Sequence, residues 1–246
     1  MLPTRFVYLL RGGNPFITLI RLLSLGGLCY LWWRDADREA LFGMHGASVQ
    51  SGLKTGFFLF ILREVIFFFR FFWRFFHNAL APDLSIGAQW PPVGVTPLVG
   101  FQIPLLNTAV LLLSGVRVTW AHHSHEASKG RESNRSLLAT VLLGVTFLSL
   151  QGAEYYEAAF SLADGIYGST FFLLTGFHGL HVIVGTAILL TALVRHFHQK
   201  ASAEHHIGLL VSIWYWHFVD VVWLFLFVCV YWWGSCQGIL RKEQGF

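Results

Sequence analysis

Six long apolar segments constrain the fold of this chain more than any other feature. They cover residues 14–33, 52–77, 101–121, 136–156, 169–197 and 208–233. Each reaches the length of about 20 residues that an α-helix needs to cross a bilayer. Inside a bilayer the backbone groups have no water to bond, so such segments must be helical. The sequence predicts an all-α, polytopic membrane helical bundle with about six transmembrane helices, forming a single membrane domain over residues 1–246.

The composition agrees with a membrane location. Charged residues make up 12% of the chain, against about 25% in soluble proteins. The Lys and Arg residues form no block with stacking aromatic residues in a polar segment, so nucleic acid is not an expected partner. The three cysteines, Cys29, Cys229 and Cys236, are widely spaced, and they suggest neither a metal-binding pair nor a disulfide framework.

The basic residues between the expected spans are unevenly distributed over the two sides of the membrane. Eight lie on the side opposite the first residues: Arg34, Arg38, Lys54, Lys129, Arg131, Arg135, Arg195 and Lys200. Four lie on the side of the first residues: Arg5, Arg11, Arg241 and Lys242. Lys and Arg are enriched on the side that is not translocated. We therefore expect both termini on the outer side.

One carboxylate stands in the middle of the second expected span. Glu64 lies between Arg63 and Val65 within a run of large apolar residues. An ionisable group at bilayer depth costs a few kcal/mol and requires a reason. Glu64 could take part in a proton relay or bind a lipid head group. It could equally be a structural carboxyl that is neutral or paired with a nearby arginine.

Three arginines share the helix that carries Glu64. At about 100° per residue, Arg63, Arg70 and Arg74 fall within roughly 20° of one angular position and form a stripe. These side chains should not face hydrocarbon. Their candidate partners are lipid phosphates, Glu64 and another subunit. Arg21 and Arg117 raise the same question in other spans.

Two pairs of polar residues lie three positions apart in the last two expected spans. His217 and Asp220 share one helix face, and so do His178 and His181. These histidines could bind a metal, relay protons or form hydrogen bonds between helices. The last interpretation is favoured, because a neutral imidazole can bridge two groups. Glu154 and Glu157, near the end of a span, are interpreted as interfacial carboxylates.

Seven further histidines could meet on one membrane face. They occur as HHSH at residues 122–125, HFH at 196–198 and HH at 205–206. Membrane di-iron enzymes gather histidines in HxxxH and HxxHH boxes, which these strings do not match. Interfacial polar residues explain the same pattern, so no metal site is predicted. The sequence also lacks the usual dinucleotide, phosphate-loop and nucleophile motifs.

Several longer strings carry a family resemblance. They are WWRD at 32–35, WPPVGVTPL at 90–98, PLLNTAVLLLSG at 104–115, TWAHHS at 119–124, QGAEYYEA at 151–158, DGIYGSTFF at 164–172, GFHGLHVIVGT at 176–186 and WYWHFVDVVWLFLFVCVYWWGS at 214–235. From about residue 14 to residue 235, the chain resembles subunit III of the mitochondrial type of cytochrome c oxidase.

The resemblance implies a subunit that has no catalytic residue and no cofactor of its own. Haem a and copper would lie in partner subunits, and phospholipids would bind in a cleft of this chain. The partners would be oxidase subunits I and II and accessory subunits, with a supercomplex with other respiratory complexes as a further option. The location would be the mitochondrial inner membrane, with both termini on the intermembrane-space side. The role would be to stabilise subunit I and to support proton uptake.

The resemblance also suggests roles for individual residues. Glu64 matches the intramembrane glutamate that reacts with carbodiimides in the family. The expected interior polar or proton-related residues are Glu64, His217, Asp220, His178 and His181. The expected lipid-binding residues are Arg34, Arg38, Arg195, Lys200, Trp32, Trp33, Arg63, Arg70 and Arg74.

The chain departs from the family pattern in three places. Members usually have seven spans, and the residues before Trp32 leave room for one, so the first helix is expected to be lost or supplied by another chain. Arginines occupy helix interiors where small residues are usual. Residues 236–246 extend past the usual end. Three other functions are considered besides this family assignment. The first is a quinol oxidase subunit III. The others are a stand-alone transporter, for which we find no inverted repeats, and a di-iron enzyme.

Overall fold

Helices form the regular structure of the described chain. The computed structural model describes residues 15–197 and 207–235, and every regular element within these ranges is helical. The elements are α2 (Pro15–Leu41), α3 (Ala47–Leu80), the short η1 (Leu84–Ile86), α4 (Ile103–Glu126), α5 (Gly130–Glu157), α6 (Gly165–Phe197), α7 (Ile207–Leu226) and the π-helical η2 (Phe227–Trp233). The predicted all-α class is therefore confirmed.

Five of these helices are long and apolar enough to cross a membrane. They lie at Phe16–Ala40, Ile103–Glu126, Gly130–Glu157, Gly165–Phe197 and Ile207–Trp233. Helix α3 has 34 residues, which gives a length of about 51 Å, but charged side chains interrupt its apolar sequence. The polytopic membrane bundle is thus confirmed, and α3 as its sixth span stays a prediction.

The chain divides into two compact units, residues 1–52 and residues 53–246. The described part of the first unit consists of α2 and the residues that follow it. The second unit contains most of α3 and all the later helices. The expectation of one membrane domain stays a prediction.

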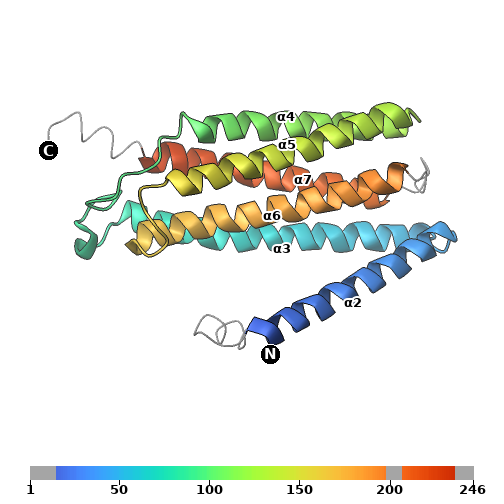
Figure 1. Cartoon of the computed structure of the whole chain (residues 1–246), viewed down its shortest axis with the longest axis horizontal. Helices are drawn as coiled ribbons and strands as arrows, with labels where there is room; N and C mark the ends of the chain where they lie inside the picture. Colours follow the sequence, from blue (N-terminus) through green and yellow to red (C-terminus); the bar gives the residue numbers. More distant parts are fainter. Residues whose placement is uncertain (1–14, 198–206, 236–246) are drawn as a thin grey trace. The chain divides into compact units, whose positions relative to one another are not determined.

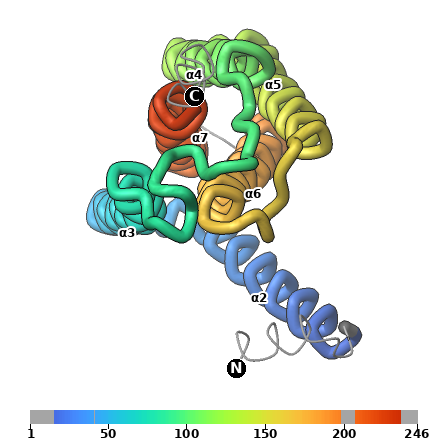
Figure 2. Tube along the Cα trace, turned by 90° about the vertical axis from the view of Figure 1, so that its left-hand side faces the viewer, coloured from blue at the N-terminus to red at the C-terminus, as the bar shows by residue number. Residues whose placement is uncertain are grey.

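Helices α4 to α7 form the closely packed centre of the second unit (Figures 1 and 2). The close pairs include α4 with α5, α5 with α6, α6 with α7, and α7 with α4. Trp216 is fully buried there, and a Cβ atom on Gly144 would come within 2.7 Å of its indole ring. The glycine permits the close approach, as small residues commonly do between membrane helices.

Helix α3 joins this centre through a layer of aromatic rings. The ring of Phe67 lies 5.1 Å from that of Phe177 on α6, and Phe60 lies 6.3 Å from Tyr215 on α7. Phe68 and Phe75 are the large side chains of α3 that are buried. Helix α3 therefore contacts α6 and α7 through aromatic side chains. Other side chains can lie between these rings.

The link between α3 and α4 is not helical except at η1, as its prolines predict. It contains a cis peptide bond between Trp90 and Pro91. Trp90 is buried, with its ring 5.4 Å from Phe75 and 5.2 Å from Tyr167. Trp90 therefore packs the link against α3 and α6.

Candidate functional site

An acid–imidazole pair lies within the aromatic layer between α3 and α6. The Oε2 atom of Glu64 is 3.2 Å from the Nε2 atom of His181. The two side chains are 13% and 12% exposed. The ring of His181 stacks on Tyr215 at 6.2 Å and meets the edge of Phe68 at 5.0 Å. Residues 117 positions apart in the sequence thus form one largely buried polar contact.

Arg63 holds the other carboxylate oxygen of Glu64. Its Nη2 and Nε atoms donate to Oε1 of Glu64 at 2.7 and 3.1 Å. The guanidinium also lies over the ring of Phe60, 4.9 Å from the centroid, an arrangement that stabilises a cation. Both oxygens of Glu64 therefore have a partner.

The backbone fixes where the protons of this pair lie. The Nδ1 atom of His181 is 2.7 Å from the carbonyl oxygen of Phe177. A carbonyl only accepts hydrogen bonds, so Nδ1 must carry a proton. A neutral ring then has a bare Nε2 atom, which cannot bond a bare carboxylate. The 3.2 Å contact between Glu64 and His181 therefore holds one shared proton.

His178 makes a different kind of contact one turn earlier on α6. Its side chain is 1% exposed, and its Nε2 atom lies 3.2 Å from the carbonyl oxygen of Val219 on α7. The ring packs against Trp223 at 5.2 Å and Phe147 at 5.6 Å. This is the geometry of a hydrogen bond between helices.

A second acid–imidazole pair lies on α7. The Nδ1 atom of His217 is 3.8 Å from Oδ2 of Asp220, which is longer than a hydrogen bond. On the other side of the ring, Nε2 lies 3.3 Å from the hydroxyl oxygen of Thr119 on α4. That hydroxyl donates to the carbonyl of Gly115 at 2.9 Å. It therefore accepts from Nε2, which carries a proton in this contact.

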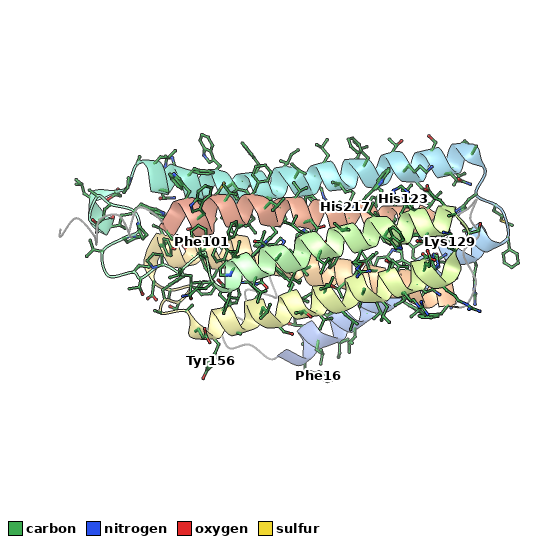
Figure 3. The ribbon with its side chains drawn as sticks, turned by 90° about the horizontal axis from the view of Figure 1, so that it is seen from above. Phe16, Phe101, His123, Lys129, Tyr156 and His217 are labelled. Atoms are coloured by element: carbon green, nitrogen blue, oxygen red, sulfur yellow. The ribbon has the colours of Figure 1, made fainter. Side chains whose placement is uncertain are left out.

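The second pair is open to the outside of the described bundle. His217 is 43% exposed and Asp220 is 10% exposed, and both line a groove of about 520 Å³ between α4 and α7, together with Trp120 and His123. Figure 3 shows His123 and His217 on neighbouring helices. Oδ1 of Asp220 is buried and has no hydrogen-bond partner among the described residues. Glu64 thus has two bonded oxygens, whereas Asp220 has one that lacks a partner.

The comparisons with known proteins match this chain over almost its whole length. The sequence model of the family described as cytochrome c oxidase subunit III matches residues 4–235. The chain belongs to the cytochrome c oxidase subunit III family.

Named relatives agree with this assignment. Cytochrome c oxidase subunit 3 of Branchiostoma lanceolatum is 55% identical over 220 residues, which is 89% of this chain and 84% of the relative. The protein of the same name in Cyprinus carpio is 57% identical over 207 residues, or 84% of this chain and 79% of the relative. That of Latimeria chalumnae is 56% identical over 224 residues, or 90% and 86%. The predicted resemblance is confirmed, and these matches favour none of the alternative functions.

Two of the three arginines on α3 have no ion-pair partner among the described residues of this subunit III family member. Arg70 and Arg74 are exposed, on the face of α3 that also carries Arg63. A groove of about 500 Å³ lies between α3 and α7, with Phe72 and Phe225 among its lining residues. Its walls are apolar. Helix α3 therefore lines an apolar groove and also carries two arginines without an ion-pair partner among the described residues.

The other residues with an expected lipid role lie near helix ends. Trp32 and Trp33 on α2 are 74% and 66% exposed. Arg34 pairs with Asp35 at 2.8 Å, and Arg38 approaches the same carboxylate at 3.9 Å. Arg195 lies in the last turn of α6. Its guanidinium lies beside Gly208 of α7, where an added Cβ atom would be 3.3 Å from Nη1. Lys200 lies outside the described residues.

Some of the histidines between spans do come together. The rings of His125 and His196 are 4.6 Å apart. His122 and His123 each approach Glu126 at 3.5 Å. Within residues 15–197 and 207–235, no three His, Cys, Asp or Glu side chains are placed to hold a metal ion. His198, His205 and His206 lie outside the described residues.

The interfacial position expected for Glu154 stays a prediction, but its side chain does not face solvent. Its side chain is 2% exposed, whereas that of Glu157 is exposed. Gln151 lies three residues before Glu154, on the same helix face. This face turns toward Tyr231 of η2, whose hydroxyl is 3.2 Å from Oε2 of Glu154. The sequence signal for this buried contact was the three-residue spacing of Gln151 and Glu154, because it places an amide and an acid on one helix face.

Proposed function

We propose that this chain is the non-redox subunit III of a cytochrome c oxidase in the mitochondrial inner membrane. Its partners would be the catalytic subunit I, which would hold haem a and copper, together with subunit II and accessory subunits. Membership of the family and the five apolar helices support this assignment. Both termini would lie on the intermembrane-space side, in line with the distribution of Lys and Arg.

Phospholipid binding is the first part of the proposed role. The groove between α3 and α7 has an apolar lining of ring and aliphatic side chains. Such a surface suits an acyl chain, because burial of apolar area is the main source of affinity. Arg70 and Arg74 carry the positive charge that a lipid phosphate would neutralise. The groove residues and the arginines lie on opposite faces of α3, so the acyl chain in the groove and the phosphates at the arginines would belong to different lipids.

Support of proton uptake is the second part, and the 3.2 Å contact between Glu64 and His181 is the observation that carries it. Two groups of high polarity hold this proton inside an aromatic layer. Arg63 fixes the carboxyl by two hydrogen bonds to one oxygen. The pair can accept or release one proton with small movements of two side chains. A positioned proton donor and acceptor of this kind is suited to a relay.

Replacement of Glu64 by Gln in the assembled oxidase tests this role. The amide of Gln can accept from Arg63 and donate to the bare Nε2 atom of His181, so the fold should persist. The variant has no acid proton, however. We expect normal assembly together with faster loss of activity during sustained turnover or a loss of bound phospholipid.

The matched control is Glu157→Gln, which changes an exposed carboxyl at the end of α5. We expect the control to behave as the native protein in both assays. Native behaviour of the Glu64 variant in sustained turnover and in lipid retention would remove Glu64 from the proposed function. Loss of assembly in the Glu64 variant would show that the carboxyl is structural.

A further inference from the structure

A second buried carboxyl lies far along the chain from Glu64, near the end of α5. Glu154, Gln151 and Tyr231 are 2%, 5% and 1% exposed. Oε2 of Glu154 accepts from Nε2 of Gln151 at 2.8 Å and from the hydroxyl of Tyr231 at 3.2 Å. Nε2 of Gln151 also lies 3.3 Å from the hydroxyl oxygen of Tyr231. The three side chains form a closed polar cluster between α5 and η2.

No positive charge balances this carboxyl within the described residues. No Lys, Arg or His described in the structure forms an ion pair with Glu154, unlike Glu64 with Arg63. The titratable groups that interact with it are phenols, Tyr155 on α5 and Tyr231 on η2. Tyr155 donates to Thr175 of α6 at 2.7 Å. An isolated buried carboxylate has a large desolvation cost, and protonation removes that cost.

The hydrogen bonds of the cluster leave two buried acceptor atoms without a donor among the described residues. Oε1 of Glu154 and Oε1 of Gln151 are both buried without a partner in the described structure. Both atoms are acceptors if Glu154 is ionised, so neither can satisfy the other. An acid proton on Oε1 of Glu154 supplies the missing donor. The acid and the amide, already joined at 2.8 Å, can then close a two-bond ring.

The π-helical segment η2 positions the phenol of this cluster. It extends α7 over Phe227–Trp233 and contains Tyr231. Ser235 donates from its hydroxyl to the backbone carbonyl of Tyr231, and the ring of Phe171 on α6 packs 5.4 Å from that of Tyr231. π-Helical turns inside α-helices are frequent at functional sites. The phenol is therefore held firmly against the carboxyl.

The cluster lies close to the surface at one end of the bundle. Glu154 is one turn from Glu157, where α5 ends. Its neighbour Tyr156 is 93% exposed, and Figure 3 shows Tyr156 at the end of α5 away from Lys129. A proton on Glu154 is thus within one helical turn of the end of α5 and of an exposed side chain.

We propose that Glu154 is a second proton-binding site of this chain, a neutral carboxylic acid held by Gln151 and Tyr231 that exchanges its proton at the end of α5. The site does not depend on the role proposed for Glu64, because the two carboxyls share no partner. The site binds a proton on the carboxyl of Glu154, which forms hydrogen bonds with the amide of Gln151 and the phenol of Tyr231.

Infrared difference spectroscopy of the assembled oxidase tests this site. The native complex minus Glu154→Gln should show the loss of one carbonyl band of a neutral carboxylic acid at neutral pH. That band should shift on transfer to D2O. The control variant Glu64→Gln should leave it in place, so a failure of the Glu64 role does not affect the result.

Tyr231→Phe provides an independent variant, in which one donor to Oε2 is lost. The acid band should persist and move to higher frequency, because its carbonyl accepts fewer hydrogen bonds. This shift identifies the band even where the Glu154 variant does not assemble. The proposal is overturned if Glu154→Gln removes carboxylate bands instead. It is equally overturned if the acid band is insensitive to D2O or to the Tyr231 change.

Discussion

The two acid–imidazole pairs have the same components in different surroundings. Glu64 and His181 come from different helices, lie 3.2 Å apart and have partners on both oxygens and both ring nitrogens. His217 and Asp220 are three residues apart on one helix, yet their atoms are 3.8 Å apart. One oxygen of Asp220 has no partner among the described residues. Proximity in sequence therefore does not predict which acid is fully bonded.

Replacing Glu64 by Leu should have the largest effect on this comparison. The change leaves Arg63 and Nε2 of His181 without their shared partner. Loss of one member of a buried charged pair costs about 3–5 kcal/mol of stability. Because the side chain of Arg63 is largely exposed, we expect a loss near the lower end of this range. Thermal unfolding of the subunit in the detergent-solubilised oxidase measures the loss.

Asp220→Leu is the matching change in the second pair. It removes a carboxyl whose nearest imidazole nitrogen is 3.8 Å away, so no hydrogen-bonded donor is left without its partner. We expect a change below about 1 kcal/mol. Equal losses for the Glu64 and Asp220 variants would contradict the distinction between the pairs.

Gly115→Ala should have the next largest effect. A Cβ atom at this position would lie 2.6 Å from Oδ2 of Asp220. The clash should destabilise the subunit by about 1–3 kcal/mol, measured by the same unfolding assay. A second change, Asp220→Ala, should restore most of the loss because it removes the opposing atom.

Gly179→Ala is the control on α6, near His181. A Cβ atom there meets no atom within 4 Å, so this variant should be at least as stable as the native protein. A loss at Gly179 as large as that at Gly115 would show that the close approach of α4 and α7 is not the cause.

Thr119→Val should have a smaller effect than Glu64→Leu and Gly115→Ala. It removes the hydroxyl that accepts from Nε2 of His217 at 3.3 Å. One exposed hydrogen bond contributes about 0.5–1 kcal/mol, and the unfolding assay should register a loss of this size. Thr146→Val is the control, because the hydroxyl of Thr146 bonds only to the carbonyl of Leu142 within its own helix. Equal results for the two threonines would mean that the ring of His217 needs no fixed partner.

Much of the fold was predictable from sequence because apolar length determines helix formation in a bilayer. Helix α3 was expected as a span at residues 52–77, but it is not among the five helices that are apolar enough to cross a membrane, so this span stays a prediction. The family was predictable from long strings such as that at residues 214–235, and it is confirmed.

The partners of the candidate site were less predictable. Glu64 was recognised as unusual, but its contact with His181 depends on how α3 and α6 pack. A local pattern contains no information on such a contact. Glu154 was assigned to the interface because it lies near a span end, whereas the π-helical turn of η2 covers it. The spacing of Gln151 and Glu154 hinted at a buried polar contact, but the covering partner Tyr231 follows from tertiary structure.

Nitrogen NMR of His181 in the assembled oxidase, labelled with 15N-histidine, tests the shared proton most directly. The signal of His181 is assigned by its loss in His181→Gln. We expect a proton on Nδ1, bonded to the carbonyl of Phe177, and a second proton shared between Nε2 and Glu64. A bare Nδ1 atom, with the only ring proton on Nε2, would contradict the account.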